Sequence, residues 1–229
     1  MKILEEYANK YSIVLTGQQL AKFKEFYNFL IQENNKYNLT NITEEKDFVI
    51  KHILDSILPQ KLFLKNANVV DIGCGAGFPS LPLKIVRDDL NITMIDSVNK
   101  KVNFCNMSID KLNIKNIIAI HSRIEDFALK NKEKFDVCCS RAVANLSTLL
   151  EYALPLLKLG GVCIFYKSLK LEEELSMAQN ALKVLGGQVL SIENFDLEDN
   201  ERKVVVIKKI KPTPKGYPRG ANKPRLKPL

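Results

Sequence analysis

The chain has 229 residues, 46% of them hydrophobic, which is enough for one sizeable core and predicts one domain with extensions. Residues 1–10 mix acids and bases, and no apolar run reaches the length of a membrane span, so the composition argues against a secreted or membrane protein and favours a soluble, cytoplasmic one. The formal net charge is +8, and residues 208–229 carry the whole excess, because they hold eight Lys and Arg and no acid. A basic segment of this kind is typical of proteins that bind a polyanion such as nucleic acid, and a solvated tail that only aids solubility is the alternative.

The front of the chain predicts helices. Thr16 can cap a helix that runs to Tyr37, along which apolar residues recur at helical spacing, and a second helix is expected over residues 44–57. Such a segment cannot form a sheet. We therefore expect residues 1–65 to be a helical extension that packs on the domain behind it.

From Asn68 onward, short apolar runs alternate with helical stretches, which is typical of a doubly wound parallel sheet. The helices are expected near residues 100–112, 148–157 and 171–185. The strands are expected at residues 69–72, 92–95, 117–120, 135–139 and 162–165, followed by an antiparallel pair at 189–192 and 204–210 that is joined by an acidic turn, 196–201.

The sequence thus predicts an α/β fold of the Rossmann-like class over residues 66–210. Its seven-stranded sheet is mostly parallel, with an antiparallel last strand. Residues 211–229 form a basic tail that holds five of the nine prolines, and we expect this tail to add nothing to the core.

Metal chemistry finds little support in the sequence. The five cysteines form no Cys-x-x-Cys pair, and His52 and His121 lie far apart in the chain. This spacing argues against a zinc site, and we expect no metal. Three of the cysteines lie in apolar runs and are expected to be small buried side chains.

A glycine-rich loop, Asp71-Ile72-Gly73-Cys74-Gly75-Ala76-Gly77, follows the first predicted strand. In open α/β sheets a ligand binds at the carboxyl ends of the strands, and glycines let the backbone approach it closely. Dinucleotide-binding loops read G-x-G-x-x-G, whereas this loop reads G-x-G-x-G with an acid, Asp71, two residues before the first glycine. That acid disfavours a phosphate and suits the aminoacyl end of S-adenosylmethionine. We expect the loop to hold this cofactor through Asp71, Gly73, Gly75 and Gly77.

The loop alone leaves three classes of protein open. Asp96, at the end of the second predicted strand, can accept both ribose hydroxyls of either cofactor and so does not discriminate between them. Taken together, these features favour a class I S-adenosylmethionine-dependent methyltransferase. An NAD(P)-dependent Rossmann oxidoreductase and a non-catalytic binding module are the alternatives.

The methyl acceptor is expected beside Ser140-Arg141-Ala142, at the end of the fourth predicted strand. The chain lacks both the Asn/Asp-Pro-Pro-aromatic sequence typical of amine methylation and the Pro-Cys typical of pyrimidine C5 methylation. Guanine N7 carries its own lone pair, so it needs positioning and a dry site rather than a base. Arg141 could hold guanine O6 or a phosphate, and a salt bridge beneath the sheet is its alternative role. An exposed or splayed guanine in RNA is the expected substrate, because the N7 edge of a paired base lies in a deep, narrow groove.

Further motifs stand in a fixed order along nearly the whole chain. They are Tyr37-Asn38-Leu39-Thr40, Lys51-His52-Ile53-Leu54-Asp55-Ser56, the glycine loop with Phe78-Pro79, Asp96-Ser97, Lys100-Lys101-Val102-Asn103-Phe104, Ser122-Arg123-Ile124-Glu125-Asp126-Phe127, Ser140-Arg141-Ala142, Tyr217-Pro218-Arg219 and Lys227-Pro228-Leu229. In this order they resemble the RsmG (GidB) family of bacterial small-subunit rRNA guanine-N7 methyltransferases.

The resemblance implies a monomeric enzyme that uses S-adenosylmethionine to methylate one guanine, guanine 527, in 16S rRNA or in a small-subunit assembly intermediate. Methylation of another RNA site is an alternative. By motif, Gly73 and Phe78 would belong to the cofactor loop and Ile124 and Glu125 would flank the adenine. Arg141 would lie at the methyl-transfer site and contact the cofactor. The residues expected to contact RNA are Lys100, Arg123, Arg219, Lys223, Arg225 and Lys227.

Overall fold

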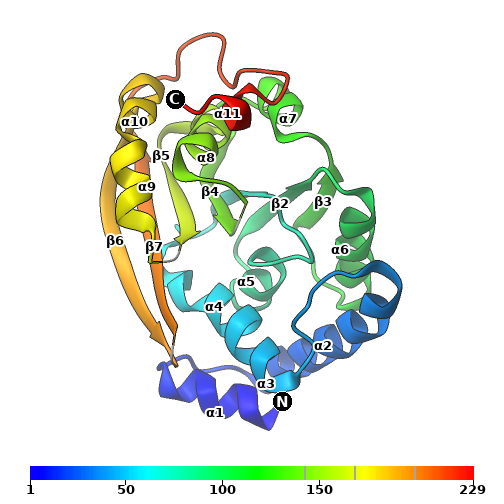
Figure 1. The fold of residues 1–229 in the computed structure, drawn as a ribbon. Coiled ribbons are helices and arrows are strands. Elements are labelled where there is room, and N and C mark those ends of the chain that lie inside the picture. Colours follow the sequence, from blue (N-terminus) through cyan, green and yellow to red (C-terminus); the bar gives the residue numbers. More distant parts are fainter. Residues whose placement is uncertain (142, 168, 199) are drawn as a thin grey trace.

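The computed structural model describes residues 1–141, 143–167, 169–198 and 200–229 (Figure 1). Two sequence predictions touch residues outside this part of the chain. Ala142 belongs to the Ser140-Arg141-Ala142 motif, and Asp199 belongs to the predicted acidic turn.

The N-terminal extension is helical, as predicted. The helix α2 (Gly17–Tyr37) begins after Thr16, whose Oγ1 accepts the Gln19 backbone N–H while the Gln19 side chain accepts the Thr16 N–H. The predicted second helix is present but is built from α3 (Glu45–Phe48), a π-helical segment η1 (Val49–Leu54) and α4 (Asp55–Ile57), followed by the 3-10 turn η2 (Leu58–Leu62). The sequence did not predict α1 (Lys2–Lys10).

All seven predicted strands lie in one sheet, in the order β3-β2-β1-β4-β5-β7-β6. The first five are parallel, and β7 runs antiparallel to both β5 and β6, so the predicted fold class is confirmed. The order reverses between β1 and β4, and this switch point is where ligands bind in such sheets. The strands are β1 (Asn68–Ile72), β2 (Asn91–Asp96), β3 (Ile117–His121), β4 (Phe135–Arg141), β5 (Leu157–Lys167), β6 (Gly187–Leu197) and β7 (Asn200–Lys209).

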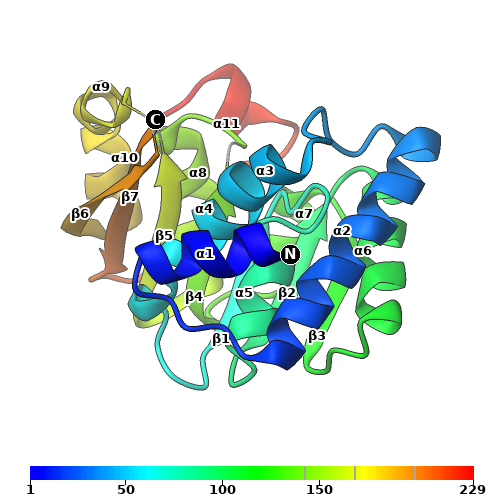
Figure 2. The same cartoon turned by 90° about the horizontal axis from the view of Figure 1, so that it is seen from below.

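Helices cover both faces of the sheet. They are α5 (Ser80–Val86), α6 (Asn99–Lys111), α7 (Ile124–Lys130), α8 (Leu146–Ala153) with the 3-10 turn η3 (Leu154–Leu156), α9 (Leu171–Met177) and α10 (Gln179–Leu185). Successive strand residues point to opposite faces, so Val69 joins one apolar cluster and Val70 the other. The first cluster also takes in the N-terminal helices, because α2 packs on α5 and α6 and α1 packs on η1 (Figure 2).

The C-terminal tail departs from the prediction. Its short helix α11 (Lys223–Leu226) contacts α8, Pro224 is buried, and Tyr217 and Leu229 pack against the second cluster. The expectation that the tail adds nothing to the core is therefore wrong. A proline-rich segment has little regular structure of its own, but here its apolar and charged side chains find partners on α8.

Two further observations bear on the predicted class. All five cysteines are free and buried, as expected of small apolar side chains. No helix in the described residues is long and apolar enough to cross a membrane.

Candidate active site

The glycine loop turns back over the carboxyl end of β2. The Gly73 N–H donates to the Ile95 carbonyl at 2.7 Å, and the Gly73 backbone has a φ of +72°. A Cβ at Gly73 would lie 2.5 Å from a Val143 methyl, and a Cβ at Gly77, whose φ is +88°, would collide with Leu81. These two positions need glycine both for backbone conformation and for space.

A cavity of about 360 Å³ opens beside this loop at the ends of β1 and β2. Its volume falls within the range of small-molecule sites. Its polar side chains include two carboxylates and several cations, and the tail supplies part of its wall. The residues concerned are Gly73, Asp96, Lys101, Arg123, Glu125, Tyr152, Asn222 and Arg225.

The Asp96 carboxylate of this cavity is held by two backbone N–H groups. It is buried, its Oδ2 accepts the Gly75 N–H at 3.0 Å, and its Oδ1 accepts the Val98 N–H at 2.9 Å. Each carboxylate oxygen has a further lone pair, so Asp96 can still accept two hydroxyl groups. Its donors are backbone atoms, which fix its direction.

The first turn of α7 forms another part of the cavity wall. Ile124 lines the cavity with an apolar side chain, and the buried carboxylate of Glu125 accepts the Tyr152 hydroxyl at 3.3 Å. Burial raises the pKa of Tyr152 to about 12, and the neighbouring Glu125 adds to the rise. Tyr152 therefore remains a hydrogen-bond donor at neutral pH. An apolar contact beside a carboxylate suits a purine ring with an exocyclic amine.

Asp71 lies beneath the loop and is not among the residues that line the cavity. It is fully buried, and its Oδ2 accepts the Ser80 hydroxyl at 2.7 Å. Its Oδ1 has no hydrogen-bond partner among the described residues. Burial raises the pKa of Asp71 to about 7. Its predicted contact with the aminoacyl end of a cofactor stays a prediction.

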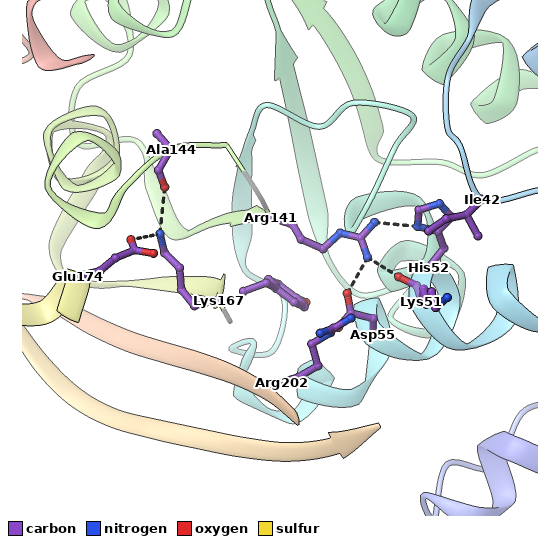
Figure 3. A pocket seen from close by; sticks show the side chains of 10 residues that line it. Ile42, Lys51, His52, Asp55, Arg141, Ala144, Lys167, Glu174 and Arg202 are labelled. Atoms are coloured by element: carbon purple, nitrogen blue, oxygen red, sulfur yellow. Dashed lines mark hydrogen bonds and ion pairs between the residues drawn. The ribbon is translucent and has the colours of Figure 1, made fainter. Parts of the chain in front are cut away.

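Arg141, at the end of β4, lies in a second cavity of about 410 Å³ (Figure 3). Its Nη1 donates to the Lys51 carbonyl at 3.0 Å and to Asp55 Oδ2 at 2.8 Å, and its Nη2 donates to His52 Nδ1 at 3.0 Å. Arg141 therefore makes the salt bridge considered as its alternative role, and that bridge lies in a cavity wall. The first cavity does not include it.

His52, in the π-helical segment, links this second cavity to the glycine loop. Its ring stacks on Phe78 with centroids 4.2 Å apart, and the Arg141 guanidinium lies 5.2 Å from the Phe78 centroid. Burial, with the charge of Arg141, lowers the pKa of His52 to about 3, so the ring is neutral. Because Arg141 donates to Nδ1, the proton sits on Nε2 and is donated to the Thr40 hydroxyl at 2.9 Å. Phe78 thus supports the loop through an aromatic cluster and does not line the first cavity.

Four charged residues of the second cavity, Asp55, Lys167, Glu174 and Arg202, were not predicted from the sequence as site residues. Asp55 binds both Arg141 and Arg202, and Lys167 donates to Glu174 and to the Ala144 carbonyl. Figure 3 draws Lys167 and Glu174 on one side of Arg141 and His52 on the other. Asp55 belongs to the Lys51–Ser56 motif, so the sequence already offered a reason to consider it as a site residue. Lys167 and Arg202 belong to no motif and reach the site only through the sheet.

Neighbouring residues line the two cavities close to the end of β4. Arg141 and Ala144 line the second cavity, and Val143 lines the first. The wall of each cavity therefore includes one of two adjacent residues, Val143 and Ala144.

The predicted RNA-binding residues lie in three different environments. Lys100, Lys223 and Lys227 are exposed and line neither cavity. Arg123 and Arg225 line the first cavity, whereas Arg219 forms an ion pair with the buried Glu151. The described residues include no group of three metal-binding side chains close enough to hold an ion.

Comparison with known proteins gives a consistent result. Residues 19–205 match the family model GidB, described as rRNA small subunit methyltransferase G. The chain is 46% identical to the Ribosomal RNA small subunit methyltransferase G of Desulforamulus reducens over 99% of this chain and 97% of that protein. It is 43% identical to the protein of the same name from Clostridium botulinum strain Alaska E43, over 97% of this chain and 95% of that one.

Among solved structures, the fold is similar to that of a SAM dependent methyltransferase from Aquifex aeolicus. The TM-score is 0.53 with 19% sequence identity, and the match covers 70% of this chain and 93% of that chain. At this identity the likeness concerns the fold.

Proposed function

Because this chain belongs to the GidB family of rRNA small subunit methyltransferases G, we propose that it methylates N7 of guanine 527 in 16S rRNA. The family fixes the coarser statement, which is that the chain is an S-adenosylmethionine-dependent methyltransferase of small-subunit rRNA. The nucleotide and its N7 atom are the proposal. Its structural support is one observation, the two cavities that are lined by the neighbouring residues Val143 and Ala144.

The first cavity fits S-adenosylmethionine. Asp96 would accept the ribose hydroxyls, Ile124 and Glu125 would hold the adenine, and the Gly73 backbone would pass close to the ligand, where a Cβ has no room. When bound, the cofactor supplies a methyl group on a positively charged sulfur. The family performs methyl transfer, which argues against the oxidoreductase alternative.

The second cavity suits an RNA base and its phosphates. It is lined by four cations, Lys51, Arg141, Lys167 and Arg202, and by two carboxylates, Asp55 and Glu174. The excess of positive charge favours a polyanion. Neutral His52 already shares its two ring nitrogens with Arg141 and Thr40, so it has no free site to act as a base.

Guanine N7 needs no base, because its lone pair attacks directly. The Arg141 guanidinium carries five N–H groups, and three of them have acceptors among the described residues. The remaining two, one on Nε and one on Nη2, can donate to guanine O6 and leave N7 free. In this proposal Arg141 orients the base, so that N7 lies in line with the methyl group to be transferred.

The test uses purified protein, S-adenosylmethionine with a labelled methyl group, and either naked 16S rRNA or isolated small subunits. Borohydride reduction followed by aniline cleaves RNA at N7-methylguanine, and primer extension locates the break. We expect one break, at guanine 527, which is absent when a transcript carries adenine there. Incorporation of label without any break would exclude N7 as the methylated atom. A break at another guanine would identify that guanine as the target in place of guanine 527.

A further inference from the structure

The C-terminal tail is held on α8 by a buried ion pair. Glu151 is fully buried, and its carboxylate accepts the backbone N–H, Nε and Nη2 of Arg219 at 2.8, 2.8 and 2.6 Å. Burying a carboxylate is costly unless cations and N–H groups surround it. Because Arg219 supplies all three donors, Glu151 is satisfied only when the tail is docked.

After this anchor the tail turns back toward the cofactor cavity. The Arg219 Nη2 also donates to the Lys227 carbonyl at 2.8 Å, and the Thr148 hydroxyl donates to the Pro224 carbonyl at 2.8 Å. These contacts place α11 beside α8, at the end of the molecule where α7 begins (Figure 1). The result is that Asn222 and Arg225 form part of the cavity wall.

The Arg225 guanidinium lies in the part of the cofactor cavity that contains Tyr152. Its Nη2 reaches the Val143 carbonyl at 3.5 Å, and its charge opposes the rise in the pKa of Tyr152 that burial and Glu125 produce. Arg225 is exposed, so most of its N–H groups are available to a ligand. It therefore lies near Tyr152, whose hydroxyl donates to Glu125, in the lining of the same cavity as Asp96.

We propose that the docked tail is the third wall of the S-adenosylmethionine site and that Arg225 covers the adenine. Asp96 suits the ribose hydroxyls, which leaves the end with Glu125 and Tyr152 for the base. A planar guanidinium can stack on a purine ring or donate to its nitrogens. The Glu151–Arg219 pair positions Arg225 without touching the ligand. This inference rests on the proposed function, because it concerns the same cofactor site.

One consequence concerns the basic residues of the tail. Arg219 and Arg225 are committed to Glu151 and to the cofactor, so only the exposed lysines are available for RNA. A second consequence is a thermodynamic coupling between cofactor binding and docking of the tail. If the cofactor contacts the docked tail, bound cofactor stabilises docking and slows local opening of this segment.

The test measures binding of two ligands by titration calorimetry. S-adenosylhomocysteine carries nucleoside and amino acid, whereas 5′-methylthioadenosine lacks the amino acid. We expect Arg225→Ala to weaken both by about tenfold, the usual effect of losing one charged contact. The matched control is Lys223→Ala, which removes a cation from the same short helix but lines neither cavity, and its dissociation constants should stay within about twofold of the parent's.

A second readout needs no variant. Limited trypsin digestion of the parent protein should cleave the Arg225–Leu226 bond several times more slowly when S-adenosylhomocysteine is present. Equal affinities for the parent and Arg225→Ala, or cleavage that ignores the ligand, would overturn the inference. A loss confined to S-adenosylhomocysteine would contradict the adenine contact and move Arg225 to the amino-acid end. If the parent protein bound neither ligand, the cofactor site itself would fail, and with it the proposed function.

Discussion

Replacing Arg141 by alanine tests the role of the second cavity apart from that of the first, because Arg141 lines only the second. The change removes the Nη1 partner of Asp55, whose side chain is 10% exposed, but the Arg202 Nε remains 3.1 Å from its other oxygen. A buried carboxylate left wholly unpaired costs roughly 3–5 kcal/mol. Because Asp55 keeps one cation, we expect a loss of about 2 kcal/mol, which lowers the melting temperature by about 4–8 °C in a domain of this size.

Activity should fall far more than stability does. Arg141 is the side chain that would fix guanine O6, so Arg141→Ala is expected to lower the rate of methyl transfer at saturating cofactor by about 100-fold. Affinity for S-adenosylhomocysteine should change by less than about twofold, because Arg141 does not line the cofactor cavity. The assays are transfer of labelled methyl to 16S rRNA, and calorimetry.

A variant of similar stability provides the control. Arg87 pairs with Asp89 at 2.7 Å and lines neither cavity, so Arg87→Ala should lower the melting temperature while methyl transfer at a permissive temperature is retained. If Arg141→Ala lost cofactor binding and methyl transfer equally, Arg141 would belong to the cofactor site. If it transferred methyl groups as fast as the control, the orienting role would be refuted.

Other changes test the remaining parts of the account. Asp96→Ala should raise the dissociation constant for S-adenosylmethionine by about 100-fold, because two hydroxyl contacts are lost, and unchanged affinity in calorimetry would sink that role. Gly77→Ala should lower the free energy of unfolding by about 2 kcal/mol, because it forces a side chain to a φ of +88° and against Leu81; a urea transition at the parental midpoint would speak against this. Joint replacement of the exposed Lys215 and Lys227 by glutamine should flatten the dependence of rRNA binding on log salt by about 1.4–1.8 units, and an unaltered slope in filter binding would show that these lysines do not contact RNA.

Local patterns in the sequence were sufficient to predict the strands of the sheet. Each strand is a short apolar run, and the run that becomes β1 ends in glycines, so both the alternation and the site of the cofactor loop were readable. Helix α7 was missed, since its seven residues are too few to show a helical period. The π-helical segment also escaped, because its apolar spacing differs little from that of an α-helix over so short a stretch.

The site was predictable in part. The structure brings Asp96, Ile124 and Glu125 together in the wall of one cavity, and their contact with the cofactor stays a prediction. The partners of Arg141 were not readable from spacing, because Asp55 lies 86 positions earlier and meets Arg141 only when the N-terminal helices pack on the sheet. The docked tail was unpredictable for the same reason. The composition indicates a solvated, proline-rich segment. The tail docks because Arg219 pairs with the buried Glu151 on α8, and that partner cannot be identified from the composition of the tail.

Mapping N7-methylguanine in 16S rRNA from cells with and without the gene for this protein tests directly whether the enzyme methylates guanine 527. Borohydride and aniline treatment of both RNAs, read by primer extension, gives the answer at every guanine. The account predicts a break at guanine 527 in the parental RNA that disappears from the deletion strain and returns when the intact gene is restored. A break at guanine 527 that persists without the gene, or one that is absent from both strains, would contradict it.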